Sequence, residues 1–173
     1  MHLPNGSFAT FGGNGAVTKG GDVGSQLNDE GSAAFDDLYQ DYDGGRAIRV
    51  LNPCTSSDNF DDTSCQWFDD PEVLAMQKRR WYSAAEPLGD GTIVLIGGFT
   101  NGGYINRNWP NTDPEFEGGA ADCTYEYYPN TAGKKPQTMD FMIKTSGLNS
   151  YAHTYLMASG KMLVQANYST SAF

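Results

Sequence analysis

A few tyrosine, histidine and cysteine side chains in this sequence have the types and spacing to do chemistry. Tyr82 comes nine residues before Gly91, and Tyr151 comes nine residues before Gly160. A tyrosine at the start of a strand is usually a packed residue with one hydrogen bond, and we expect that role for Tyr151. The alternative is a phenol that faces a metal ion, and the residues around Tyr82 decide between the two.

The two histidines carry weaker signals. His153 follows Tyr151 by two residues, so on a strand it can share the side of Tyr151. We expect a hydrogen-bonded strand histidine, with a supporting contact to a nearby site as the alternative. His2 precedes a turn, and we expect no chemical role for it.

The three cysteines point to a disulfide. Cys54 and Cys65 bracket a polar stretch, and their spacing matches no zinc pattern, so a loop disulfide is the expected structure. Cys123 is left over and is either unbridged or paired outside this chain. A disulfide indicates an oxidising compartment. Asparagine sequons at Asn5 and Asn167 agree with a secreted protein that carries N-glycans and has its signal peptide upstream.

Composition excludes several classes of function. The chain has 173 residues, 11 Lys and Arg, 21 Asp and Glu, and a formal net charge of −10. A nucleic-acid binder needs a basic face, and so does a polybasic membrane anchor. No apolar run of 18 residues is present, so no membrane span is expected. With 21 glycines and 13% aromatic residues, the sequence resembles an acidic all-β protein rather than a disordered chain.

The elements that must position these residues come from a repeat. Residues 3–13, 88–98 and 157–167 align, and each has an apolar residue, a polar-Gly turn and a short β-rich run. The turn pairs Asn-Gly, Asp-Gly and Ser-Gly suit tight hairpins. A further strand follows at residues 47–53 in the first repeat and at 124–129 in the second. This order is that of a kelch repeat, one four-stranded propeller blade per unit.

The expected architecture is therefore all-β, a partial kelch-type β-propeller. We assign the whole chain, 1–173, to one incomplete propeller domain. Residues 1–70 form a first blade with a long insertion, 78–140 a second blade, and 145–173 the start of a third. Because two or three blades leave open sheet edges, and both ends fall inside strands, we expect a fragment of a longer protein.

Two long insertions interrupt the repeats. The first, from Asn14 to Gly45, is rich in Gly, Asp and Ser and is expected to be a solvated loop without the order of a calcium loop. The second, from Asn101 to Asp122, contains the aromatic residues Tyr104, Trp109 and Phe116. These aromatics either line a pocket mouth or pack over the blade.

The stretch from Lys78 to Gly98, with its Arg-Arg-Trp-Tyr segment ending at Tyr82, resembles the glyoxal oxidases. These are copper radical oxidases related to galactose oxidase. The resemblance extends to residues 118–122, 124–129 and 145–154, and so covers most of the chain. It implies a seven-bladed propeller with one copper ion held by two tyrosines and two histidines. It also implies a radical tyrosine joined to a cysteine through a thioether, which oxidises small aldehydes to acids while O₂ is reduced to H₂O₂.

The resemblance assigns the radical tyrosine, a copper ligand, to Tyr82. The equivalent position one repeat earlier lies about four residues before Met1, which is where the resemblance places the cysteine. The other copper ligands of the family fall beyond Phe173, so this chain alone is expected to be inactive. Galactose oxidase has a tryptophan in a loop where the alignment puts Thr100, so a different stacking group and a small aldehyde substrate are expected. The run Lys78 to Arg80 is otherwise expected to be solvated, with Arg80 able to pair with a carboxylate.

Two alternatives stay open. A non-catalytic kelch module that binds a glycan or a protein would use the aromatic insertion around Trp109. A truncated gene product would have no stable fold.

Overall fold

The computed structural model describes residues 1–13, 26–27, 33–36, 41–100, 121–130, 132–145, 151–165 and 171–172. In this part of the chain almost all regular structure is antiparallel β-sheet. The exceptions are one short helix, α1 (Asp140–Thr145), and a single 3₁₀ turn at Thr63–Cys65. The prediction of an all-β protein is therefore confirmed.

The first sheet contains three strands in the order β1 (Phe8–Phe11), β5 (Ile48–Leu51) and β6 (Trp67–Phe68). An isolated bridge from His2 to Phe8 extends it on the β1 side. The sheet is therefore an antiparallel meander, and β5 lies within the strand expected at residues 47–53.

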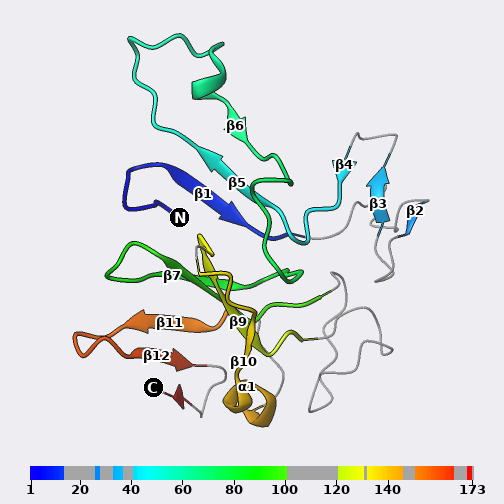
Figure 1. The fold of residues 1–173 in the computed structure, drawn as a ribbon, viewed down its shortest axis with the longest axis vertical. Helices are drawn as coiled ribbons and strands as arrows, with labels where there is room; N and C mark the ends of the chain where they lie inside the picture. Colours follow the sequence, from blue (N-terminus) through cyan, green and yellow to red (C-terminus); the bar gives the residue numbers. More distant parts are fainter. Residues whose placement is uncertain are drawn as a thin grey trace.

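The second sheet is a four-stranded meander and lies beside the first (Figure 1). Its strands are β7 (Ala84–Pro87), β8 (Ile93–Ile96), β9 (Thr124–Tyr128) and β10 (Gln137–Thr138), paired in chain order. Strand β7 starts where β8 ends, because Ala84 pairs with Ile96. The residues just before β7 therefore lie at the end of the sheet away from the hairpin turn.

The third sheet repeats the pattern with β11 (His153–Leu156), β12 (Met162–Gln165) and β13 (Ser171–Ala172). In Figure 1 the three sheets follow one another from top to bottom, with their hairpin turns on the same side. Glu86 on β7 joins the second and third sheets, since its carboxylate accepts hydrogen bonds from the Thr154 hydroxyl and the Leu156 N–H.

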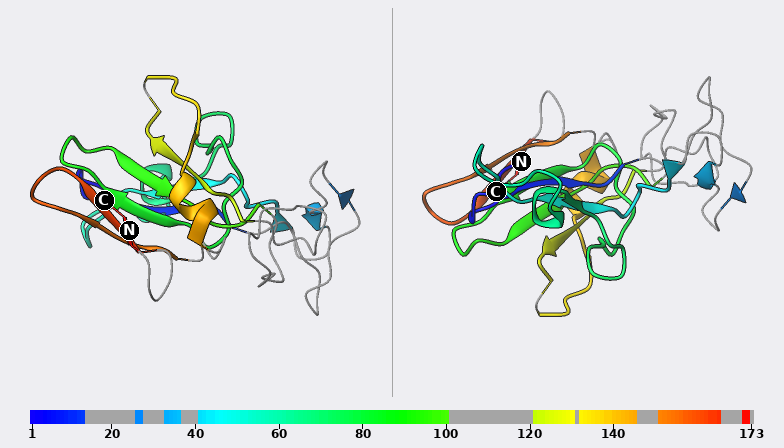
Figure 2. Two further views of the ribbon diagram at one scale, coloured as in Figure 1. Left: turned by 90° about the horizontal axis from the view of Figure 1, so that it is seen from below. Right: turned by 90° about the horizontal axis from the view of Figure 1, so that it is seen from above.

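The first insertion is more structured than the predicted solvated loop. It contains a small sheet of β2 (Gln26–Leu27), β3 (Ala33–Asp36) and β4 (Asp41–Tyr42). Figure 2 shows this sheet extending from the end of the molecule opposite to the hairpin turns. Three strands of two to four residues pair locally, which the Gly-rich and Asp-rich composition did not indicate.

The three aligned repeats form the same hairpin, as predicted. In each turn the first residue's N–H donates to the carbonyl oxygen of the fifth residue at 2.7–2.8 Å. The fourth residue's N–H donates back to the first residue's carbonyl oxygen at 2.9–3.0 Å. The fourth residue is glycine with φ between 80° and 87°, a backbone conformation that other residues reach only with strain. These glycines are Gly6, Gly91 and Gly160.

A side chain completes each turn in the same way. Asn5 accepts the N–H of Ser7, Asp90 accepts that of Thr92, and the Ser159 hydroxyl accepts that of Lys161. Short polar side chains favour turns because they can hydrogen-bond the backbone two residues on. One local rule therefore explains why three different dipeptides form one turn.

Strand β8 is buried on both faces because a sheet packs on each side of it. Ile93 and Leu95 face the first sheet, and Val94 and Ile96 face the third. All four side chains are 5% exposed or less. The strand is therefore continuously apolar, and it lacks the alternation expected of a strand with one face in water.

The predicted loop disulfide between Cys54 and Cys65 is present. Cys123 lies in the core between the second and third sheets. Asn5 is exposed in its hairpin turn, whereas Asn167 lies outside the described residues. Among the described residues, no helix has the length and apolar character needed to cross a bilayer.

Candidate functional site

The segment before Tyr82 is anchored by a buried arginine. Arg80 is fully buried, and its Nε donates to Glu126 Oε1 at 2.9 Å. Its Nη1 donates to the carbonyl oxygens of Gly97 and Thr124, and Nη2 donates to the Thr124 hydroxyl. The Asp122 carboxylate lies 3.7 Å from Nη1. The alternative that Arg80 pairs with a carboxylate is therefore confirmed.

Arg79 is also buried, with 5% of its surface exposed, so the prediction of a solvated charge run is wrong at both arginines. Its guanidinium pairs with the Asp43 carboxylate, and its Nε donates to the Thr100 carbonyl oxygen at 3.0 Å. Gly45 lies against the same guanidinium, and a Cβ there would approach Arg79 within 2.7 Å. Each buried charge has a partner, which explains why the side chains leave water. Lys78 alone is exposed as expected.

This pairing ties both insertions to the segment before Tyr82. Asp43 is near the end of the first insertion, and Thr100 directly precedes the second. Both insertions therefore leave the sheets at the end where Tyr82 lies. Long loops gathered at one end of a rigid scaffold are where binding and catalytic residues concentrate.

Trp81 extends the second sheet beyond β7. Its N–H donates to the Phe99 carbonyl oxygen at 2.9 Å, and the Phe99 N–H donates back at 2.8 Å. Gly98 lies against this bridge, with φ of 88° and no room for a Cβ beside the Trp81 carbonyl oxygen. The Gly-Gly pair of the repeat thus gives the backbone the space and the conformation that this end of the sheet requires.

Tyr82 has an uncommon backbone conformation. Its φ is 63°, in the left-handed region, which costs roughly 1–2 kcal/mol for a residue with a side chain. Its half-buried ring stacks on Trp81 with centroids 3.9 Å apart and planes at 23°. Bulky residues held in this region cluster at active sites and ligand clamps. The residue singled out from the sequence is therefore also distinctive in its geometry.

Tyr151 has the same backbone conformation at the equivalent position of the next sheet, with φ of 48°. Its N–H donates to the Tyr82 carbonyl oxygen at 2.8 Å, and the two rings stack 4.8 Å apart. Tyr151 is 60% exposed, so it is not the packed tyrosine that we predicted. The sequence pattern placed both tyrosines at equivalent positions but could not show that they touch.

The other candidates lie apart from this stack. His153 lies on strand β11, where it pairs with Gln165 across the sheet, and its side chain is exposed. The His2 ring contacts Phe8 edge-on. Tyr104, Trp109 and Phe116 lie outside the described residues.

The described residues do not make a metal site by themselves. They contain no group of three or more His, Cys, Asp or Glu side chains that could hold a metal ion. Tyr82 and Tyr151 offer phenol oxygens, and oxygen and nitrogen ligands suit Cu(II). A copper ion at this place would need further ligands from other residues.

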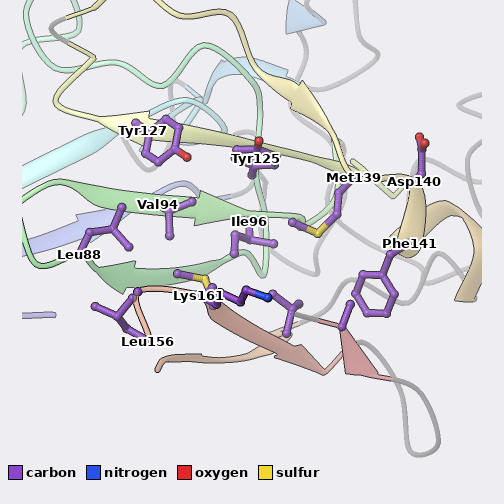
Figure 3. A pocket seen from close by; sticks show the side chains of 14 residues that line it. Leu88, Val94, Ile96, Tyr125, Tyr127, Met139, Asp140, Phe141, Leu156 and Lys161 are labelled. Atoms are coloured by element: carbon purple, nitrogen blue, oxygen red, sulfur yellow. The ribbon is translucent and has the colours of Figure 1, made fainter. Parts of the chain in front are cut away.

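An apolar pocket of about 520 Å³ lies between the second and third sheets (Figure 3). Val94, Ile96 and Leu156 contribute apolar side chains, while Asp140 and Lys161 supply charge. Tyr82 and Tyr151 do not line this pocket. Burial raises the pKa of the Tyr127 phenol, which lines this pocket, above its ordinary value.

Sequence reasoning missed the acidic partners of the two arginines. Glu126 stands between two tyrosines of β9, and alternation along the strand places it on the opposite face. The sequence offered one signal for this pair. A single acidic residue stands in an aromatic strand, and the same repeat contains two consecutive arginines. No protein-family model, curated protein or solved structure matches this chain.

Proposed function

We propose that this chain is part of an extracellular copper radical oxidase of the glyoxal oxidase type, built on a kelch-type propeller. Such an enzyme oxidises small aldehydes to carboxylic acids and reduces O₂ to H₂O₂. Tyr82 would be its radical tyrosine and one copper ligand, with the remaining ligands and the thioether cysteine supplied by residues outside this chain. The observation that carries the proposal is the strained, stacked conformation of Tyr82 in the Arg-Trp-Tyr segment.

The contact between the two tyrosines supports the expected thioether. Equivalent positions at the starts of the second and third sheets touch, through the Tyr151 N–H and the Tyr82 carbonyl oxygen at 2.8 Å. The first and second sheets repeat the same meander, and Gly13 donates to the Arg80 carbonyl oxygen at 3.1 Å. By the same repeat, the position about four residues before Met1 would lie beside Tyr82. A cysteine there could bond to the ring of Tyr82.

Open sheet faces support a longer propeller. Phe8 and Trp67 stand in one row across the first sheet, with centroids 6.2 Å apart, and are 37% and 47% exposed. Tyr155 on the third sheet is 56% exposed. Exposed apolar rows on the first and last sheets of a stack are suited to packing against further sheets.

The test uses the full-length secreted protein loaded with copper. We expect H₂O₂ release with glyoxal or methylglyoxal, and loss of this activity in Tyr82→Phe but not in Tyr155→Phe. Mass spectrometry of wild-type protein should find the Tyr82 peptide joined to a cysteine peptide, with two hydrogens fewer than their sum. A copper-replete protein that neither releases H₂O₂ nor carries the cross-link would rule out the oxidase and leave the binding module as the remaining candidate.

A further inference from the structure

Tyr82 and Tyr151 form a matched pair. Among the described residues they are the two non-glycine positions with positive φ, at 63° and 48°. Each stands nine residues before the turn glycine of its own hairpin. The same uncommon conformation at two equivalent positions is therefore a property of the repeat.

Among the described residues, this pair is not the only link between the second and third sheets. Glu86 already links β7 to β11 through Thr154 and Leu156. Tyr151 is 60% exposed, so less than half of its surface is removed from water. A glycine at residue 151 would adopt the same φ without strain. Neither burial nor the backbone conformation therefore explains why a tyrosine stands at residue 151.

The ring of Tyr151 contacts the ring of Tyr82. The two planes are at 26° with centroids 4.8 Å apart, and Trp81 stacks on Tyr82 as well. The Tyr151 N–H also binds the Tyr82 carbonyl oxygen. One neighbour therefore holds both the backbone and the side chain of Tyr82.

We propose that Tyr151 is a positioning residue for Tyr82. Its N–H and its ring hold the Tyr82 phenol against Trp81, and the stacked rings stabilise the oxidised form of that phenol. A one-electron metal oxidant takes up the electron that Tyr82 loses, while the hydroxyl proton leaves to solvent. A neighbouring electron-rich ring favours the electron-poor product. The redox part of this proposal rests on the function proposed above, whereas the positional part does not.

The experiment compares variants of the full-length protein. Tyr151→Ala removes the ring and Tyr151→Phe keeps it. Tyr155→Ala removes a tyrosine of similar exposure, 56%, from β11 without touching the stack. Tyr151→Gly is the second ring-deleted variant in case the alanine at φ of 48° impairs folding.

The first readout is the position of the Tyr82 ring. In deuterated protein with labelled Tyr and Trp rings, nuclear Overhauser contacts between Tyr82 and Trp81 are assigned by their loss in Tyr82→Phe. We expect these contacts to be lost or weakened in Tyr151→Ala and Tyr151→Gly, and kept in Tyr151→Phe and Tyr155→Ala. Unchanged contacts in both ring-deleted variants would overturn the positional proposal.

The second readout is the midpoint potential for oxidation of Tyr82 by a one-electron oxidant, hexachloroiridate(IV). Oxidation is followed through the tyrosyl radical signal, which is assigned to Tyr82 by its absence in Tyr82→Phe. We expect a higher midpoint potential in the ring-deleted variants and an unchanged one in Tyr151→Phe and Tyr155→Ala. The same midpoint potential in all variants would overturn the redox part of this proposal without contradicting the proposed oxidase function. If wild-type protein forms no Tyr82 radical, the oxidase and the redox part both fail, and the ring contacts alone decide the positional part.

Discussion

The Arg80 guanidinium and the Glu126 carboxylate form a buried ion pair, with Nε and Oε1 separated by 2.9 Å. The same carboxylate accepts the backbone N–H groups of Gln77 and Lys78. Glu126 thus connects β9 to the whole approach segment of Tyr82. A buried ion pair whose remaining hydrogen-bonding groups are satisfied holds its segment in place. Removal of one partner leaves the other charge buried in the core without compensation.

Removing Arg80 should therefore be costly. We expect Arg80→Met to lower the free energy of unfolding by about 3–5 kcal/mol, because Glu126 is left buried without its cation. Urea unfolding measures this change. Lys78→Met, at an exposed position two residues earlier, should change stability by no more than about 0.5 kcal/mol. Equal effects of the two variants would contradict the role given to the buried pair.

Two glycines with similar backbone conformations should respond differently to alanine. Gly91→Ala meets no atom closer than 3.8 Å, so it should cost only the left-handed strain, about 1–2 kcal/mol. Gly12→Ala would overlap the Arg80 carbonyl oxygen and should cost about 1–3 kcal/mol more. Both changes in the free energy of unfolding are measured from the midpoints of urea unfolding curves, provided that the dependence of that free energy on urea concentration is unchanged. A Gly12→Ala variant as stable as Gly91→Ala would mean that Arg80 does not approach Gly12.

The disulfide should stabilise its loop. Because Cys54 and Cys65 are 11 residues apart, replacing both with serine should cost about 2–3 kcal/mol by chain entropy. Peptide mapping of the unreduced protein after cleavage at Asp58 should find the Cys54 and Cys65 peptides joined, and reduction should separate them. Separate Cys54 and Cys65 peptides before reduction would show that the disulfide does not form in the native protein.

The second hairpin turn should loosen in acid. Hydrogen bonds from the Thr92 hydroxyl and N–H lower the pKa of Asp90 below 3.8. The stabilisation is therefore present above pH 3.8 and is lost as the pH falls through the lowered pKa. Amide exchange of Thr92 measured from pH 5 to pH 2 should show its protection fall over this window.

The first turn supplies a matched control. Asn5 accepts the equivalent bond from the Ser7 N–H, and an amide does not titrate in this range. The protection of the Ser7 amide, corrected for the pH dependence of intrinsic exchange, should stay constant from pH 5 to pH 2. In Asp90→Asn the Thr92 amide should also keep constant protection. If Thr92 in Asp90→Asn keeps the pH dependence of wild type, another group is responsible.

The chain's local structure was readable from its residues. Turns at Gly6, Gly91 and Gly160 follow from short-range rules, since a polar residue before glycine satisfies its own backbone. The strands after these turns and the disulfide between Cys54 and Cys65 also follow from pattern and spacing. Each of these features is decided within about a dozen residues.

Tertiary structure alone decided which side chains surround Tyr82. Burial of Arg80 depends on Glu126, 46 residues away, and burial of Arg79 depends on Asp43, 36 residues away. The stack of Tyr82 with Tyr151 joins two sheets. A charge run is solvated unless the fold brings acidic partners to it, and the separation of residues along the chain does not fix how close those partners come in space. The sequence by itself determined that the two tyrosines occupy equivalent positions, and only packing of sheet against sheet placed them in contact.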